Sequence, residues 1–175
     1  MFKALWLNIS LILISFVTFA QVEKEIDPPF NIKTITFVQN NQNSIPLFSL
    51  NDPFEIQFDD LYGNEANYYY EIVHCNYDWK HSDLSKNEYL QGFDGIRIQE
   101  YTNSLNTLQL FSHYRIGFPN KNTRLLVSGN YMIKILNEDR EVVFSRKLML
   151  YEDLVSVPMQ IKRARTLSNI NYKQN

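Results

Sequence analysis

The sequence predicts an all-β protein, built as an antiparallel β-sandwich. Three observations indicate this class. Apolar and polar residues alternate over several short stretches, and turn residues separate those stretches at short intervals. After the first twenty residues, no stretch shows a convincing helical period. Aromatic residues make up 14% of the chain against only 5 glycines, which favours a well-filled β core over a disordered chain.

The first twenty residues are predicted to be a secretory signal peptide. Lys3 supplies a positive charge, residues 4–19 are almost wholly apolar, and Ala20 places a small residue just before Gln21. The alternative is an uncleaved membrane anchor, but the apolar run is short for a span. We therefore expect residues 1–20 to be removed, leaving a soluble mature chain without an integral membrane span.

Charge and cysteine usage exclude some partners. The formal net charge of the whole chain is −2, so no basic field attracts nucleic acid or an anionic membrane. The single cysteine, Cys75, cannot form an internal disulfide in an exported protein. We expect it to be a small, buried and inert hydrophobic residue.

Residues 21–29 are polar, contain two adjacent prolines and are expected to form an extended lead-in. The sandwich is expected over residues 30–152. Alternation predicts its first strand over residues 32–38 and a half-buried strand over residues 54–60. Between them, the stretch around Pro46 is predicted to be an edge strand, because proline cannot donate to a sheet ladder.

The stretch from residue 68 to residue 84, YYYEIVHCNYDWKHSDL, organises the rest of the chain. In an extended conformation it carries apolar residues on both sides, so it is predicted to be a central strand between two layers. His74 and Cys75 are expected to be structural. Trp79, just past the strand end, is predicted to close one end of the core. A hairpin is the simplest connection to the strand before it.

Zinc would accept any of the following side chains from the same stretch: His74, Cys75, Asp78 and His81. Adjacent residues on a strand point to opposite faces, so His74 and Cys75 cannot reach one ion unless the strand bulges. The same geometry argues against a Cys–His nucleophile. We therefore expect neither a metal nor any other cofactor.

Residues 83–105 show no sustained period of either kind and are predicted to be a long loop, with one helical turn over residues 82–89. Long loops in compact domains are usually functional or packed by their own side chains. On the functional interpretation, the loop binds a partner through four candidate residues: Tyr89, Phe93, Arg97 and Tyr101. On the alternative interpretation, its aromatic residues hold the loop against the sandwich.

The last part of the sandwich is predicted to contain a strand over residues 107–118 and a pair over residues 131–136 and 141–150. A Gly-Asn turn leads into Tyr131, which resembles the tyrosine corner of immunoglobulin-like sandwiches. This feature makes an immunoglobulin-like topology the expected one. Alternation starts again after residue 153, which indicates that residues 153–175 begin a second domain or form a linker.

Several short motifs, in order along residues 54–152, together resemble the type IX secretion system plug protein family of Bacteroidetes. No single motif is specific, but the ordered set is. The motifs are FDDL at residues 58–61, Tyr68 and Tyr70, HCNYDW at residues 74–79, Ser82 and Leu84, EYLQGF at residues 88–93, Ser104, Asn106, Thr107, His113 and Tyr114, FPN at residues 118–120, and SGNY at residues 128–131.

The resemblance implies a periplasmic, non-catalytic protein whose partner is an outer-membrane secretion translocon, the periplasmic opening of which it closes. The family's chains are usually much longer, so the resemblance implies its N-terminal domain only. It supplies no catalytic residues.

Two other functions compete with this one. A carbohydrate-binding module would stack sugars on exposed tyrosines, for which the candidates are Tyr62, Tyr68, Tyr69, Tyr77, Tyr89 and Tyr101. A hydrolase would use paired carboxylates, either Asp59 with Asp60 or Asp78 with Asp83. Neighbouring residues diverge on a strand, which argues against the first pair.

Overall fold

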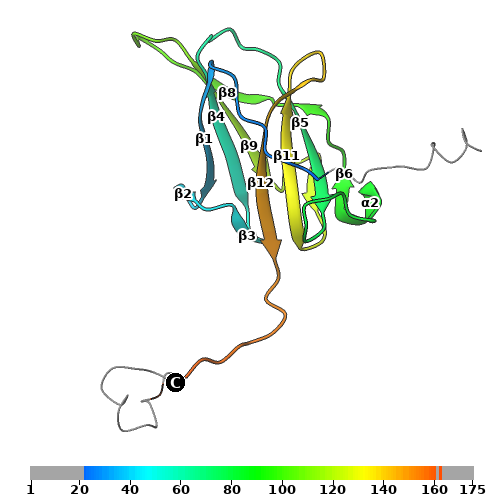
Figure 1. The fold of residues 1–175 in the computed structure, drawn as a ribbon. Coiled ribbons are helices and arrows are strands. Elements are labelled where there is room, and N and C mark those ends of the chain that lie inside the picture. The colour runs from blue at the N-terminus through cyan, green and yellow to red at the C-terminus, as the bar shows by residue number, and fades with distance from the viewer. Residues whose placement is uncertain (1–21, 161, 163–175) are drawn as a thin grey trace, which may run out of the picture.

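The computed structural model describes residues 22–160 and residue 162, and it confirms the predicted all-β sandwich (Figure 1). One five-stranded sheet has the order β2-β1-β4-β9-β8, and the other has the order β3-β12-β11-β5-β7. Two short strands, β10 and β6, pair separately. The predicted signal peptide lies outside the described residues, and the immunoglobulin-like topology stays a prediction.

The elements of the described chain have the following bounds: β1 (Ile32–Gln39), β2 (Gln42–Ser44), β3 (Leu47–Ser49), β4 (Phe54–Asp60), β5 (Tyr69–Cys75), α2 (Lys86–Tyr89), β6 (Leu90–Gly92), β7 (Ile96–Arg97), β8 (Glu100–Asn103), β9 (Ser112–Phe118), β10 (Thr123–Leu125), β11 (Gly129–Leu136) and β12 (Val142–Tyr151). None of the helices in this part of the chain is long and apolar enough to cross a membrane.

The core lies between the two sheets and is largely aromatic. Phe58 of β4 stacks on Tyr114 of β9, with ring centroids 5.1 Å apart, and meets Phe144 of β12 edge to face at 5.2 Å. All three side chains are buried. Offset and edge-to-face pairs at such distances add to the stabilisation from burial. Because the described residues include a single cysteine, packing rather than a disulfide joins the sheets.

The predicted hairpin between the strands at residues 54–60 and 69–75 is wrong. β4 pairs with β1 and β9, whereas β5 pairs with β11 and β7 in the facing sheet. Residues 61–68 therefore cross from one layer to the other. β4 buries one whole face, β5 buries Tyr70 and Ile72 on its inner face, and Phe58 meets Tyr68 across the interior at 5.4 Å. If β4 and β5 had paired in one sheet, their buried faces would lie on the same side of that sheet and could not face each other across the core.

Strand β5 has apolar residues on both faces, as predicted, and the structure shows what covers each face. Tyr70 and Ile72 point into the sandwich, whereas Val73 and Cys75 form a small outer cluster with Met132. The described part of the lead-in is residues 22–29. It runs over this outer face, where Val22 pairs with Lys80 and the Ile26 carbonyl accepts a hydrogen bond from the Ser145 N–H.

The sandwich has two ends, which we call the Asp60 end and the Phe54 end. β4 runs from Phe54, paired with Phe118, to Asp60, paired with Ser112. β12 finishes at the Phe54 end, because the Tyr151 carbonyl accepts a hydrogen bond from the Leu50 N–H at 2.9 Å. The seven residues of β4 span about 20 Å, which is the approximate distance between the two ends. The chain after β12 leaves the sandwich at the Phe54 end (Figure 1).

Two further strand predictions have different outcomes. The edge strand near Pro46 is present as β3, which pairs in parallel with β12. The strand predicted over residues 107–118 begins only at Ser112, and residues 104–111 form a loop instead. Residues 152–160 form no strand and are exposed. The second domain stays a prediction.

Candidate partner-binding surface

Residues 83–105 close one open side of the sandwich by passing from one sheet to the other. They form α2, which the sequence predicted as a helical turn, and then the short strands β6, β7 and β8, which it did not predict. β7 pairs with β5, and β8 pairs with β9 in the facing sheet. Between them Ile98 is buried, and its N–H donates to the Tyr68 carbonyl at 2.7 Å. Much of the segment is therefore structural.

Tyr89, one of the four predicted partner-binding residues, is buried and cannot serve as an exposed anchor. Only 7% of its surface is accessible. Its ring lies 5.6 Å from that of His74 and 6.2 Å from that of Tyr131, and its hydroxyl donates to the Ile72 carbonyl at 3.4 Å. The single turn of α2 directs this side chain inward, so Tyr89 holds the segment against the core.

The other three predicted residues differ in exposure. Phe93 has 74% of its surface accessible, and its N–H donates to the Asn122 carbonyl at 2.8 Å, so an exposed ring stands on a fixed backbone. Arg97 on β7 is also exposed. Tyr101 is half-buried: its ring packs 5.5 Å from Tyr114, and its hydroxyl donates to Glu65. Phe93 and Arg97 are thus the members of the set that a partner can reach.

A groove of about 360 Å³ lies beside Arg97, between the segment and the turn after β9. Charged residues of both signs line it, namely Glu55, Arg97, Glu100, Arg115 and Lys121. Such a lining suits a polar chain rather than an apolar one.

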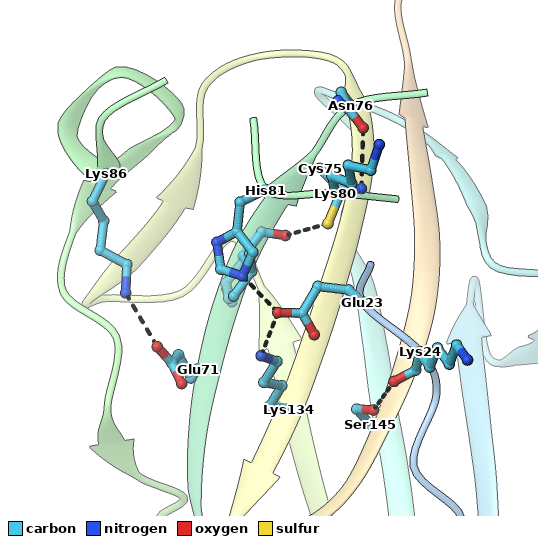
Figure 2. Close-up of polar contacts among 12 residues, drawn as sticks. Glu23, Lys24, Glu71, Cys75, Asn76, Lys80, His81, Lys86, Lys134 and Ser145 are labelled. Atoms are coloured by element: carbon cyan, nitrogen blue, oxygen red, sulfur yellow. Dashed lines mark hydrogen bonds and ion pairs between the residues drawn. The ribbon is translucent and has the colours of Figure 1, made fainter. Parts of the chain in front are cut away.

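A polar cluster on the outer face, shown in Figure 2, fastens the lead-in to the second sheet. The Glu23 carboxylate accepts hydrogen bonds from Lys134 at 2.8 Å and from His81 at 2.6 Å. Burial by itself raises the pKa of Glu23, but the hydrogen bonds from Lys134 and His81 outweigh it and hold the pKa below its ordinary value. Sequence reasoning missed this cluster, because no local pattern links residues 111 positions apart.

Cys75 is buried, as predicted, and it lies under this lead-in (Figure 2). Burial raises the pKa of its thiol to about 11. Trp79, however, does not close the end of the core. It is half-buried on the outer face, where the Lys147 ammonium lies 4.1 Å from its ring. The reason is local: the Asn76 side chain accepts hydrogen bonds from two N–H groups of residues 78–80 and folds that turn back over the sheet.

His74 and Tyr131 both contribute to the interior. Their rings lie 4.9 Å apart, and burial lowers the pKa of His74. The Tyr131 hydroxyl donates to the Val127 carbonyl, four residues upstream, at 2.7 Å. This is the hydrogen bond that a tyrosine corner makes.

The carboxylates proposed for hydrolysis do not converge on one site. Asp59 bonds to His113 at 2.6 Å, whereas Asp60 is buried and accepts from Asn31 and Tyr68. Asp78 pairs with Lys80 at 2.8 Å. Within residues 22–160 and 162, no group of three His, Cys, Asp or Glu side chains is placed to hold a metal ion.

The tyrosines proposed as a sugar platform are also dispersed. Tyr68 and Tyr89 are buried. Tyr62 follows β4 at the Asp60 end, whereas Tyr77 follows β5, which runs toward the Phe54 end, and both are exposed. They do not form a single stacking surface.

Exposed leucines in the loop 104–111 were also missed by sequence reasoning. Leu105, Leu108 and Leu110 all face solvent. Leu108 and Leu110 alternate with polar residues, and that pattern predicts a strand just as well as an exposed loop.

Comparison with known proteins identifies the family. The family model for the first domain of the type 9 secretion system plug protein matches residues 32–152, which begin with β1 and include β12. No curated protein matches. The crystal structure of a hypothetical protein from Parabacteroides merdae ATCC 43184 is similar, with a TM-score of 0.70 and 36% sequence identity. That match covers 75% of this chain and 35% of the other, so the chain spans about a third of the length of that relative. Family match, fold and motif order agree: this chain belongs to the type 9 secretion system plug protein family and contains its first domain.

Proposed function

We propose that this chain is a non-catalytic, periplasmic protein-binding module that docks on the outer-membrane translocon of the type IX secretion system and helps to close its periplasmic opening. The observation that carries the proposal is the family match over residues 32–152, which spans the whole sandwich. A plug acts by occupying a surface of its partner, so its working parts are exposed side chains on a rigid scaffold.

The surface around residues 83–105 supports this role. Phe93 presents an exposed aromatic ring on a backbone that the hydrogen bond to Asn122 fixes. Arg97 lies beside a groove lined by charges of both signs. Aromatic and arginine side chains dominate binding energies at protein interfaces, and a fixed backbone lowers the entropy lost on binding.

Affinity purification from cells that carry the type IX machinery tests the proposal. The tagged protein is compared with a Phe93→Ala, Arg97→Ala variant and with a Tyr77→Ala control, which removes an exposed aromatic elsewhere. We expect the wild type and the control to recover the translocon and the double variant to recover less of it. Failure of the wild type to recover the translocon would contradict the proposed function. Equal recovery by all three proteins would place the contact outside these two residues.

A further inference from the structure

The loop between β8 and β9 is longer than the connection requires. Two residues suffice to join adjacent antiparallel strands, whereas this loop has eight, residues 104–111. It projects from the Asp60 end of the sandwich, at the upper left of Figure 1. Its three leucines are exposed: Leu105 by 83%, Leu110 by 58% and Leu108 completely. Exposed apolar clusters on a soluble domain often mark interaction sites.

The polar groups of this loop bond to one another and leave the leucines outside. The Ser104 hydroxyl accepts from the Phe111 N–H at 2.9 Å, and the Thr107 hydroxyl donates to the Gln109 carbonyl at 2.7 Å. The Gln109 amide donates to the Leu61 carbonyl at 2.8 Å, which ties the loop to the neighbouring turn. The loop is therefore preorganised, and its leucines would lose little backbone freedom on binding.

The neighbouring turn fits closely against the loop. Gly63 has a φ of +58°, and a Cβ there would lie 3.1 Å from the Leu110 Cβ. Tyr62, also exposed, precedes it at the same end of the sandwich. The two segments together form one projecting surface, which we call the apolar tip: Tyr62, Leu105, Leu108 and Leu110.

The charges around the apolar tip indicate the kind of surface that it fits. No Asp, Glu, Lys or Arg occurs from Tyr101 to Tyr114. The Glu65 carboxylate of the neighbouring turn lies at the base of the loop, where it accepts hydrogen bonds from Tyr101 and Asn103. An anionic lipid surface is bound through clustered lysine and arginine, which this stretch lacks. A tip that carries leucines and no basic residue is complementary to an apolar groove in a protein. In addition, β12 ends at the opposite Phe54 end, so the tip points away from the place where the chain leaves the sandwich.

We propose that the apolar tip is the contact through which this domain inserts into an apolar groove of its protein partner. Since the partner is taken to be the type IX translocon, the inference rests on the function proposed above. The tip contributes affinity through leucine burial, and the surface at Phe93 and Arg97 contributes a separate contact through an aromatic ring and a guanidinium group.

The test measures binding of the mature protein to purified, detergent-solubilised translocon. The variant is Leu105→Ser, Leu108→Ser, Leu110→Ser, and the matched control, Ile45→Ser, Tyr77→Ser, changes two exposed residues outside the tip. All proteins are first shown to melt alike. We expect the control to bind like the wild type and the tip variant to bind at least about 100-fold more weakly, because each leucine that the groove buries contributes roughly tenfold through the apolar surface it removes from water.

Three results would overturn the inference, and they can be told apart. Equal binding by the wild type and the tip variant places the contact elsewhere and leaves the proposed function intact. Flotation of the wild type with phosphatidylethanolamine vesicles, lost in the tip variant, assigns the leucines to lipid. No binding by the wild type refutes the proposed function and the assigned partner together. A photo-crosslinking residue at position 108 gives an independent readout, with a crosslink to the translocon expected.

Discussion

Replacing Asp60 by alanine should destabilise the domain far more than the same change at its neighbour Asp59. Asp60 is fully buried, and its carboxylate accepts hydrogen bonds from the Asn31 side chain at 2.8 Å and the Tyr68 hydroxyl at 2.9 Å. It also accepts from the Tyr62 N–H at 3.1 Å. Asp59, by contrast, is partly exposed and bonds to His113.

The expected magnitudes follow from the groups left without partners. Asp60→Ala leaves two buried donors, the Asn31 amide and the Tyr68 hydroxyl, without an acceptor. Each unpaired buried donor costs about 1–3 kcal/mol, so the free energy of unfolding should fall by about 2–6 kcal/mol. A domain's free energy of unfolding is about 5–15 kcal/mol, so this loss brings it close to unfolding. Asp59→Ala removes one partly exposed pair, which is worth about 0–1 kcal/mol.

Urea unfolding followed by tryptophan fluorescence measures both free energies. Asp60→Asn provides a folded comparison if the alanine variant does not accumulate, since the amide oxygen still accepts one hydrogen bond. We expect Asp60→Asn to lower the free energy of unfolding by about 1–3 kcal/mol, which lies between the effects of Asp59→Ala and Asp60→Ala. If Asp59→Ala and Asp60→Ala lowered the free energy of unfolding by amounts that agree within about 1 kcal/mol, the buried hydrogen bonds of Asp60 would not be what holds this end of the sandwich together.

Three further results are expected. Cys75 should react slowly with thiol reagents under native conditions, because burial raises the pKa of its thiol to about 11; rapid labelling would contradict that burial. Gly92→Ala should lower the melting temperature much more than Gly95→Ala. Both residues have positive φ, but a Cβ at Gly92 would lie 2.0 Å from the Asn122 carbonyl oxygen, against 3.6 Å from the nearest atom at Gly95. The folded-state pKa of Glu23 is lowered from 4.5, so its pairing stabilises the fold above that pH and is lost as the pH falls through the lower value. Glu23→Gln should therefore reduce the stability at neutral pH and flatten its decline in acid, and an unchanged acid profile would argue against this pairing.

The sequence predicted the strands well where apolar residues alternate against a buried face. β4 follows its pattern residue by residue, with Phe54, Ile56 and Phe58 buried. Prediction failed where long-range contacts decide the structure. Periodicity identified β4 and β5 but could not tell whether they share a sheet, because it records which face is buried and not which strand lies alongside.

Loops were harder for the same physical reason. Trp79 was predicted to lie in the core from its apolar character, but the Asn76 side chain turns the loop backward through two hydrogen bonds to backbone N–H groups. Similarly, the hydroxyls of Ser104 and Thr107 shape a loop in which alternating leucines face solvent. Short side chains that bond to nearby backbone offer an alternative to the sheet ladder. The effect of such a side chain depends on which backbone groups it can reach, and the pattern of apolar residues in the sequence gives no information about that.

The residues that carry the family resemblance have mainly such shaping roles. Asp60 binds three donors, the Asn120 side chain accepts from two N–H groups of the following turn, and the Tyr131 hydroxyl bonds to Val127. Such residues specify a sandwich and the paths of its loops, so the motifs predict the fold more directly than they predict the partner. Under the proposed function, partner binding then depends on exposed side chains of those loops that do not pack against the sandwich. The exposed leucines of the apolar tip meet this condition, whereas the buried Tyr89, although it lies within a motif, does not.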